Sequence, residues 1–271
     1  MVIGELEARK QIVYYSRKTH AQGLVCATDG NLSVRLSKER FLITPSGIRK
    51  EDVTIDDLLV IDSDGNPVGD TRRPSTEYKV HLEAYRRRDD ISAVIHAHPP
   101  KSIAFTLTKT PLDTCILPEV VVTLGDVPVA PYATPSTDDL PGSMSDLIAV
   151  SDVVMLARHG SVTVGATMAE AFKKLEKLEH NAEILIYAHM LGGAQPFSHQ
   201  EIHRLQGLRD FYGIQTKVRG CGCRPEWNDS KAACSGGEGE CRSPGENPEA
   251  LSPADLETLV DEIVRRVREA L

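Results

Sequence analysis

The sequence predicts an α/β or α+β sandwich of about 215 residues, followed by a linker and a separate terminal helix. Short aliphatic and β-branched runs, bounded by Gly, Pro and Asn, alternate with segments whose apolar residues recur at helical spacing. From residue 221 the composition changes to Gly, Pro, Ser and acidic residues and the periodicity is lost. We therefore expect one folded domain over residues 1–217, in which no internal repeat is visible.

Composition and charge exclude several classes of protein. The 271 residues carry 39 acidic and 31 basic side chains, which give a formal net charge of −8 without any basic tract. A nucleic-acid partner is therefore not expected. No apolar run is long enough to span a membrane, and charged residues interrupt the N-terminus where a signal peptide would be apolar. We expect a cytoplasmic protein without a membrane partner.

The first half of the predicted domain begins with a helix and continues with strands. Apolar residues at helical spacing predict an amphipathic helix from Glu5 to about Ala21, which Gly23 ends. Pro74-Ser75-Thr76-Glu77 opens a second helix with Ser75 as its N-cap. Between the two helices, three strand segments are expected: a turn entering a strand at 28–35, a strand running into a turn at 41–47, and a short strand at 58–61.

The second half contains apolar runs and one long helix. Thr167 and Glu170 form a capping box at the start of this helix, and Gly192-Gly193 stops it. The elements before it are, in order, an apolar strand at 91–98, a short helix at 102–108, β-branched runs at 120–123 and 127–129, a short helix ending at 148, and a buried strand from 153 that continues through 164.

Residues 218–250 have the composition of a linker, and residues 251–271 again have the pattern of a helix. Ser252 is a good N-cap and Pro253 suits the first helical position. One apolar face follows, made of Leu256, Leu259, Val260, Ile263, Val264, Val267 and Leu271. A short amphipathic helix on a long linker is expected either to bind a partner groove or to dock on its own domain. The mixed charge of its polar face disfavours a membrane surface.

His96 and His98 form the motif around which the predicted site is organised. They lie at i and i+2 at the end of an apolar run, so both side chains project from the same face of a strand. Neutral imidazoles in this arrangement can bind one divalent metal, whereas a single histidine is more often an ordinary partly buried side chain. His159 lies at the end of a second apolar strand and would complete a three-histidine site.

Glu77 is the carboxylate that we expect to act as acid and base beside this metal. Its alternative role is only that of a favourable negative charge at a helix N-terminus. Three turns rich in hydroxyl groups and glycine offer backbone N–H groups, hydroxyls and an amide to an anion such as phosphate. The residues of these turns are Gly30, Asn31, Ser46, Gly47, Ser75 and Thr76.

Together these motifs resemble those of a known enzyme superfamily. The motifs are Gly30-Asn31-x-Ser33-x-Arg35, Thr44-Pro45-Ser46-Gly47, Ser75-Thr76-Glu77, His96-x-His98 and Arg158-His159-Gly160. In order and spacing they are similar to those of the class II sugar-phosphate aldolases, the L-fuculose-1-phosphate aldolase and L-ribulose-5-phosphate 4-epimerase superfamily. The resemblance covers about residues 5–215.

The resemblance implies a three-layer α/β/α sandwich and a homotetramer with its active sites between subunits. By the same resemblance, one zinc ion per subunit would be bound by His96, His98 and His159, and Glu77 would be the acid/base that also touches the metal in the empty site. The three turns would bind the substrate phosphate, and Tyr212 would be contributed across the subunit interface. The implied reaction is cleavage of L-fuculose 1-phosphate or L-rhamnulose 1-phosphate to dihydroxyacetone phosphate and L-lactaldehyde.

Two alternatives to this reaction stay open. An epimerase is the first, although Pro99-Pro100 follows the histidine pair where the epimerases carry other residues. A non-catalytic aldolase-fold scaffold for shell assembly is the second. The terminal helix resembles the encapsulation peptides that carry enzymes into bacterial microcompartments, whose lumen would contain a reactive aldehyde.

The resemblance does not account for four late cysteines, Cys221, Cys223, Cys234 and Cys241. Four thiolates can bind a second metal or an iron–sulfur cluster, but this spacing fits no common pattern. A linker that merely tolerates the cysteines is the other interpretation.

Overall fold

The computed structural model describes residues 4–211 and 214 of the chain. Several predictions lie outside the described residues, namely those for Tyr212, the linker at 218–250, the four late cysteines and the terminal helix at 251–271. Among the described residues, no helix is long and apolar enough to cross a membrane.

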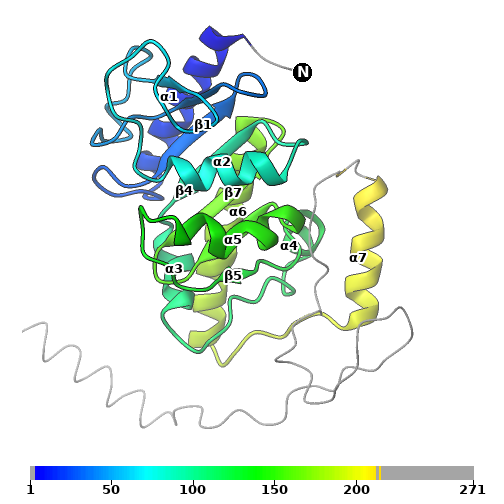
Figure 1. Cartoon of the computed structure of the whole chain (residues 1–271). Coiled ribbons are helices and arrows are strands. Elements are labelled where there is room, and N and C mark those ends of the chain that lie inside the picture. The colour runs from blue at the N-terminus through cyan, green and yellow to red at the C-terminus, as the bar shows by residue number, and fades with distance from the viewer. Residues whose placement is uncertain (1–3, 212–213, 215–271) are drawn as a thin grey trace, which may run out of the picture. The chain divides into compact units, whose positions relative to one another are not determined.

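Helices are interspersed with strands along the chain (Figure 1). The helices are α1 (Glu5–Ala21), α2 (Tyr78–Arg87), α3 (Pro100–Thr106), α4 (Pro118–Thr123), α5 (Asp139–Val150), α6 (Met168–Met190) and α7 (His199–Phe211). The strands are β1 (Asn31–Arg35), β2 (Phe41–Ile43), β3 (Leu59–Ile61), β4 (Ala93–Ala97), β5 (Val129–Ala130), β6 (Val153–Leu156) and β7 (Gly160–Gly165).

The described strands form one seven-stranded sheet in the order β3-β2-β1-β4-β7-β6-β5. Its neighbouring strands are antiparallel, except β5 and β6, which are parallel. Helices α1, α3, α4 and α6 contribute to the hydrophobic core on one face of the sheet, and α2 and α5 to the core on the other. The helices α2 and α5 cross the front of the sheet in Figure 1. This architecture confirms the predicted three-layer α/β/α sandwich.

The alternation of side chains along β4 divides its residues between the two cores. Ala93, Ile95 and Ala97 pack in the core with α1 and α6, while Val94 packs in the core with α2 and α5. His96 has the same parity as Val94, so its side chain lies on the α2 face. The central strand of the sheet thus presents a metal-binding type of side chain toward the N-terminus of α2.

Two stretches with a strand pattern do not fold as the sequence predicts. The strand expected to continue from 153 through 164 is a hairpin, because the chain reverses at Ala157–His159 and β6 and β7 pair antiparallel. Arg158 makes this reversal in the left-handed region, at φ 60°. The β-branched run at 120–123 has a strand composition but forms α4, which packs against α6 and α7. Burial of these valines between helices overrides the local preference.

The capping box of α6 is confirmed. The side chain of Thr167 accepts a hydrogen bond from the N–H of Glu170 at 3.2 Å. The Glu170 carboxylate in turn accepts from the N–H of Ala166 at 2.9 Å. The helix therefore begins where the sequence predicts, and its buried face runs along the centre of the first core.

Candidate metal centre

Four side chains from three separate segments converge at one end of the central strands. His96 is the fourth residue of β4, and His98 follows the end of that strand. His159 comes from the hairpin turn between β6 and β7, and pairing of β7 with β4 brings this turn to the histidine pair. Glu77 comes from the start of α2. The structure therefore brings together the four residues that the sequence predicts at the histidine site.

The nitrogen and oxygen atoms of these side chains are close enough to share one ion. The Nε2 atoms of His96 and His98 are 3.1 Å apart. Glu77 Oε2 lies 3.1 Å from His96 Nε2, and Glu77 Oε1 lies 3.1 Å from His159 Nε2. One donor atom from each of the four residues lies within 4.8 Å of the others. All three imidazoles thus present Nε2 to a common centre.

The opposite ring nitrogens orient the imidazoles. His96 Nδ1 lies 3.0 Å from the carbonyl oxygen of Ser161, which can only accept, so Nδ1 carries the proton and Nε2 is free to bind a metal. His98 Nδ1 lies 3.6 Å from a carboxylate oxygen of Asp29. A carbonyl partner such as that of His96 fixes the tautomer and the ring orientation of a metal-binding histidine.

Burial and charge also favour the metal-binding protonation states. Burial, together with the charges of His96 and His159, lowers the pKa of His98 to about 3, so this imidazole is neutral. Burial by itself would raise the pKa of the Glu77 carboxyl, but its interactions with His159 and His96 hold that pKa well below its usual range. A neutral imidazole and an ionised carboxylate are the forms that ligate metals.

The surroundings fit a bound cation. Among the described residues, Glu77 Oε1 is buried without a hydrogen-bond partner. Three imidazole nitrogens that could bind a metal lie around the Glu77 carboxylate. An acceptor left bare in this way costs free energy unless an ion or water satisfies it. Three imidazoles and one carboxylate are a donor set that suits zinc and other first-row divalent metals.

Gly160 leaves the space that the histidines occupy. A Cβ atom at this position would lie 2.5 Å from the carbonyl oxygen of Ala97, 2.9 Å from Cδ2 of His98 and 3.1 Å from Cε1 of His96. No real Cβ atom approaches backbone oxygen so closely, so either the strand pairing or the imidazoles would have to move.

We expect Gly160→Ala to weaken metal binding by about 10–100-fold, the usual effect of disturbing the supports of metal ligands. Overpacking should also lower the free energy of unfolding by about 1–3 kcal/mol. Gly142→Ala is the matched control, because its Cβ would meet nothing within 4 Å and alanine favours the helix α5. Metal titration and urea unfolding of both variants check this prediction, and equal metal affinity in the two would contradict it.

The anion-binding turns predicted from the sequence adjoin the histidines. Asn31 pairs with His96 across β1 and β4, and its amide nitrogen lies 2.8 Å from Ser75 Oγ. The N–H of Ser46 donates to Arg73 and that of Ser75 to Thr44, so the second turn lies beside the start of α2. Three of the predicted residues, Ser46, Gly47 and Thr76, are exposed at these turns.

Gly30 has a positive φ of 72° and comes so close to β4 that a Cβ would lie 2.9 Å from the carbonyl oxygen of His96. A glycine is therefore required where the first turn enters β1.

The predicted N-cap of α2 was wrong. The helix begins at Tyr78 with Glu77 in the N-cap position, so Glu77 precedes the first turn. Ser75 instead belongs to a tight turn, in which its carbonyl oxygen accepts from the N–H of Tyr78 and its own N–H is bound to Thr44. The pairing of this segment with the end of β2 decides where the helix can start.

Comparison with known proteins identifies the family. Residues 10–186 match the family described as the class II aldolase and adducin N-terminal domain. The chain belongs to the class II aldolase family.

Relatives in this family have different names at similar identity. The chain is 30% identical over 210 residues to a 5-deoxy-D-ribulose 1-phosphate aldolase from Bacillus thuringiensis, covering 76% of this chain and 97% of the relative. It is 29% identical to a 3-oxo-tetronate 4-phosphate decarboxylase from Haemophilus influenzae, covering 66% and 87%. A solved L-fuculose 1-phosphate aldolase superposes with a TM-score of 0.69 at 31% identity, covering 76% and 96%.

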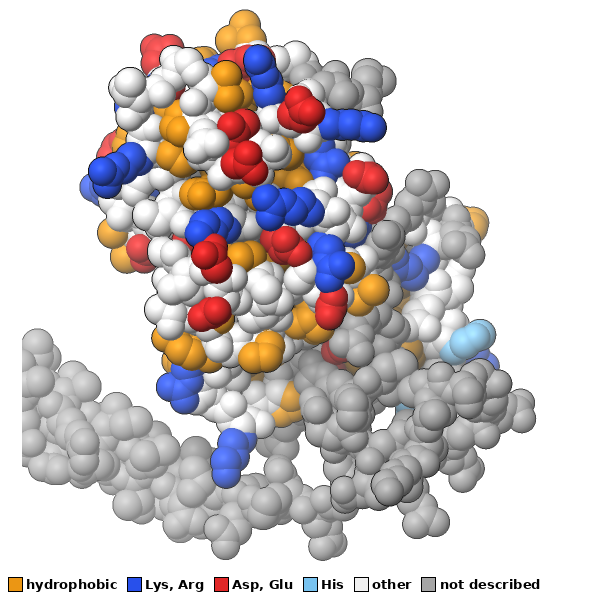
Figure 2. Space-filling view, viewed as in Figure 1, with side chains coloured by type: hydrophobic (Ala, Val, Ile, Leu, Met, Phe, Trp, Pro, Cys, Tyr) orange, Lys and Arg blue, Asp and Glu red, His pale blue; other side chains and the backbone are white. Residues whose placement is uncertain are grey.

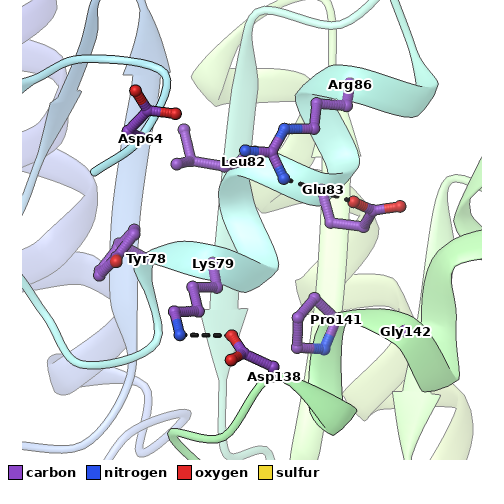
Figure 3. A pocket seen from close by; sticks show the side chains of 9 residues that line it. All are labelled: Asp64, Tyr78, Lys79, Leu82, Glu83, Arg86, Asp138, Pro141 and Gly142. Carbon is purple, nitrogen blue, oxygen red and sulfur yellow. Dashed lines mark hydrogen bonds and ion pairs between the residues drawn. The ribbon is translucent and has the colours of Figure 1, made fainter.

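The class II aldolase domain also has a pocket away from the metal centre. This pocket of about 380 Å³ opens on the outer side of α2, toward α5 (Figure 3). Its cations face acids within the pocket, Lys79 toward Asp138 and Arg86 toward Glu83. Figure 2 shows basic and acidic side chains interspersed over this face of the molecule. Because both cations of the pocket are paired with acids, it offers little positive charge to an anionic substrate.

Sequence reasoning missed Lys50, which supports the turns of the class II aldolase site. Its side chain is 1% exposed, and Nζ donates to the carbonyl oxygens of Thr28 at 2.9 Å and Ile48 at 3.0 Å. Lys50 thus joins the turn before β1 to the turn after β2. No local pattern could reveal this role, because a lysine in a polar turn is normally exposed.

Burial lowers the pKa of Lys50 to about 8, against the opposing charge of Asp29. Between about pH 8 and 10.5 the unfolded chain therefore holds a proton that the folded chain has lost, so the free energy of unfolding rises with pH in this window. Below about pH 8 the Lys50 side chain is charged in the folded protein, and this buried charge lowers the free energy of unfolding. In Lys50→Met this pH dependence of the free energy of unfolding disappears.

We expect the stability of the wild type relative to Lys50→Met to increase by about 1–3 kcal/mol from about pH 7.5 to about pH 10. Urea unfolding at both pH values measures it. A difference between the two proteins that does not change with pH would contradict the prediction.

Proposed function

We propose that this member of the class II aldolase family is a zinc-dependent enzyme that cleaves a deoxyketose 1-phosphate, either L-fuculose 1-phosphate or L-rhamnulose 1-phosphate. The products are dihydroxyacetone phosphate and L-lactaldehyde. The observation that carries the proposal is the convergence of His96, His98, His159 and Glu77 beside turns rich in amide and hydroxyl donors. A named L-fuculose 1-phosphate aldolase among the similar structures supports the substrate class.

The residues of the chain divide the work of the reaction. We assign the metal to His96, His98 and His159, and when bound it supplies Lewis-acid polarisation of the substrate carbonyl. The bond between C3 and C4 breaks, the C4 hydroxyl loses its proton as the aldehyde forms, and C3 must gain a proton. Glu77 lies beside the histidines and is the group that we assign to protonate C3.

The phosphate of the substrate is assigned to the three turns. The backbone and hydroxyl groups of Ser46, Gly47, Ser75 and Thr76, with Gly30 and the Asn31 amide, would hold it at the start of α2. Binding the phosphate there fixes the distance between the reacting carbons and Glu77. The free energy of phosphate binding is thereby used to position the C3–C4 bond, although the phosphate itself does not react.

The assay that tests the proposal combines metal analysis with coupled detection of dihydroxyacetone phosphate on both deoxyketose phosphates. We expect about one zinc ion per chain and cleavage of either sugar phosphate. Bound zinc without cleavage of either sugar phosphate would contradict the substrate assignment. Because relatives at similar identity include the 5-deoxy-D-ribulose 1-phosphate aldolase and the decarboxylase, their two substrates are assayed alongside. L-Ribulose 5-phosphate tests the epimerase alternative. No metal and no turnover at all would favour a scaffold.

The same assay on a variant with serine at Cys221, Cys223, Cys234 and Cys241 separates the histidine site from a second site. Unchanged zinc and activity would make the cysteines dispensable. Zinc or iron present only in the wild type would assign a metal or redox site to them.

We further propose a homotetramer in which Tyr212 reaches the site of a neighbouring subunit. This proposal comes from the family resemblance of the sequence. Light scattering after gel filtration measures the mass, and a monomer with full activity would overturn it.

Residues 251–271 are proposed to direct the enzyme into the lumen of a bacterial microcompartment. The amphipathic pattern of this segment and the linker before it support the proposal. Deletion of residues 250–271 is expected to leave kcat and KM within about twofold, because the segment lies outside the matched family domain. A fluorescent fusion of the full chain should form foci in cells that assemble shells, and the truncated fusion should be dispersed. Equal localisation of the two fusions would refute the targeting function.

A further inference from the structure

A continuous line of buried polar side chains runs from the inner face of α2 to the metal centre. His81 lies one helical turn after Glu77 and is 1% exposed. Its Nδ1 lies 2.6 Å from Ser33 Oγ, which in turn lies 2.8 Å from the hydroxyl of Tyr85. Its Nε2 contacts Oδ1 of Asn31. Fully satisfied networks of this kind are rigid and hold one arrangement of donors and acceptors.

The carboxylate of Glu77 decides the direction in which these groups donate. The Asn31 amide nitrogen lies 2.8 Å from Ser75 Oγ and 3.4 Å from Glu77 Oε2, and a carboxylate oxygen can only accept. The amide oxygen of Asn31 therefore faces His81, whose Nε2 must donate. Burial, together with the charge of His96, lowers the pKa of His81 to about 3, so the ring is neutral. Its Nδ1 can then only accept.

The rest of the line follows from this tautomer. Ser33 donates its hydroxyl proton to His81 Nδ1, and its oxygen accepts from the hydroxyl of Tyr85. At the other end, Ser75 Oγ accepts from Asn31 and, at 3.4 Å, from the backbone N–H of Glu77. The hydroxyl proton of Ser75 is thus directed away from these donors. Every donor along the line points toward the turns assigned to the substrate phosphate.

We propose that His81 is a positioning residue that fixes the Asn31 amide with its NH₂ group toward Ser75 and the bound phosphate. The inference rests on the function proposed above, because it takes the phosphate to bind at these turns. Without a donor at His81 Nε2, the Asn31 amide can rotate and turn its oxygen toward Glu77 and the phosphate. Two acceptors would then face each other, and the site would repel the anion that it must bind.

His81→Leu and His81→Gln test the proposal in the zinc-loaded full-length enzyme. Calorimetry measures the Kd of inorganic phosphate, and kinetics give kcat and KM for the sugar phosphate that the wild type cleaves. Leucine should raise the phosphate Kd and KM by about 10–100-fold, the loss of one to two hydrogen bonds to a charged group, while zinc content and kcat change far less. Glutamine carries an amide N–H that can reach Asn31, so it should recover both constants to within about threefold of the wild type.

Tyr85→Phe is the matched control within the same core. It removes the most distant hydroxyl of the line and leaves the donor at His81 Nε2 in place, so phosphate binding should change by less than about threefold. Leucine and glutamine variants with equal phosphate affinity would overturn the proposal, as would a loss of kcat and zinc with unchanged phosphate affinity.

A spectroscopic measurement keeps the test valid if His81→Leu does not fold. The ¹⁵N spectrum of histidine-labelled wild type reports which ring nitrogen carries the proton, and the His81 signal is identified by its loss in His81→Gln. The Nε2–H tautomer is expected, and Nδ1–H would overturn the proposal. Phosphate binding and the tautomer can both be measured even if neither deoxyketose phosphate is cleaved. Failure of the substrate assignment can therefore be distinguished from failure of the proposal for His81. A wild type that binds no phosphate would overturn both.

Discussion

His96→Ala is expected to abolish metal binding and activity together. His96 is 0% exposed on the central strand β4, and its Nε2 lies 3.1 Å from both His98 Nε2 and Glu77 Oε2. The substitution removes one of the three metal-binding ring nitrogens. It also leaves a cavity where the buried imidazole was. Metal analysis of the purified variant should find less than about a tenth of the wild-type zinc, and cleavage should be undetectable.

His180, an exposed histidine of α6, supplies the matched control. His180→Ala removes an imidazole of the same chain without touching the cluster, so its zinc content and kcat should equal those of the wild type. If His96→Ala kept its full complement of zinc, the metal would have to be bound elsewhere and the assignment to the histidines would be wrong.

Glu77→Gln is expected to retain zinc and to lose turnover. Glutamine has almost the same shape as glutamate but cannot carry the proton that C3 must gain. The loss of a general acid or base costs about 10²–10⁴-fold in kcat. His96 and His98 would still converge on the centre, because their Nδ1 atoms face Ser161 and Asp29 and not Glu77. Zinc analysis and steady-state kinetics on the same preparation measure the two effects.

Glu83→Gln controls for a change of carboxylate on α2. Glu83 belongs to the same helix but faces the outer pocket and the arginines beside it, so kcat should stay within about twofold of the wild type. Turnover of Glu77→Gln at the rate of the wild type would remove Glu77 from the mechanism. Loss of zinc together with turnover would instead make Glu77 a required ligand.

The sequence alone determined the sandwich and most of the candidate centre. The i and i+2 spacing of His96 and His98 predicts that both side chains lie close together, since alternate residues of a strand project from the same face. The capping box of Thr167 and Glu170 likewise involves only near neighbours and was confirmed. Where the interaction is local, the residue pattern is sufficient.

Only the tertiary structure decided the elements that depend on long-range pairing. The helix α4 arises from a β-branched run because those valines are buried against α6 and α7. The start of α2 moves to Tyr78 because Ser75 is held by Thr44, a residue far away in the sequence. His159 joins the histidine pair because the chain reverses at Arg158 and β7 returns beside β4.

The supports of the site show the same division. Lys50 and His81 have no local signature, since a lysine in a turn and a histidine in a helix are ordinary features of a sequence. Their roles appear only when the fold buries them against carbonyl, hydroxyl and amide groups from distant segments. The sequence thus predicted which side chains gather at the candidate centre, whereas the packing of the sheet against α2 decided which groups support them, because buried polar groups must find their partners wherever the fold places them.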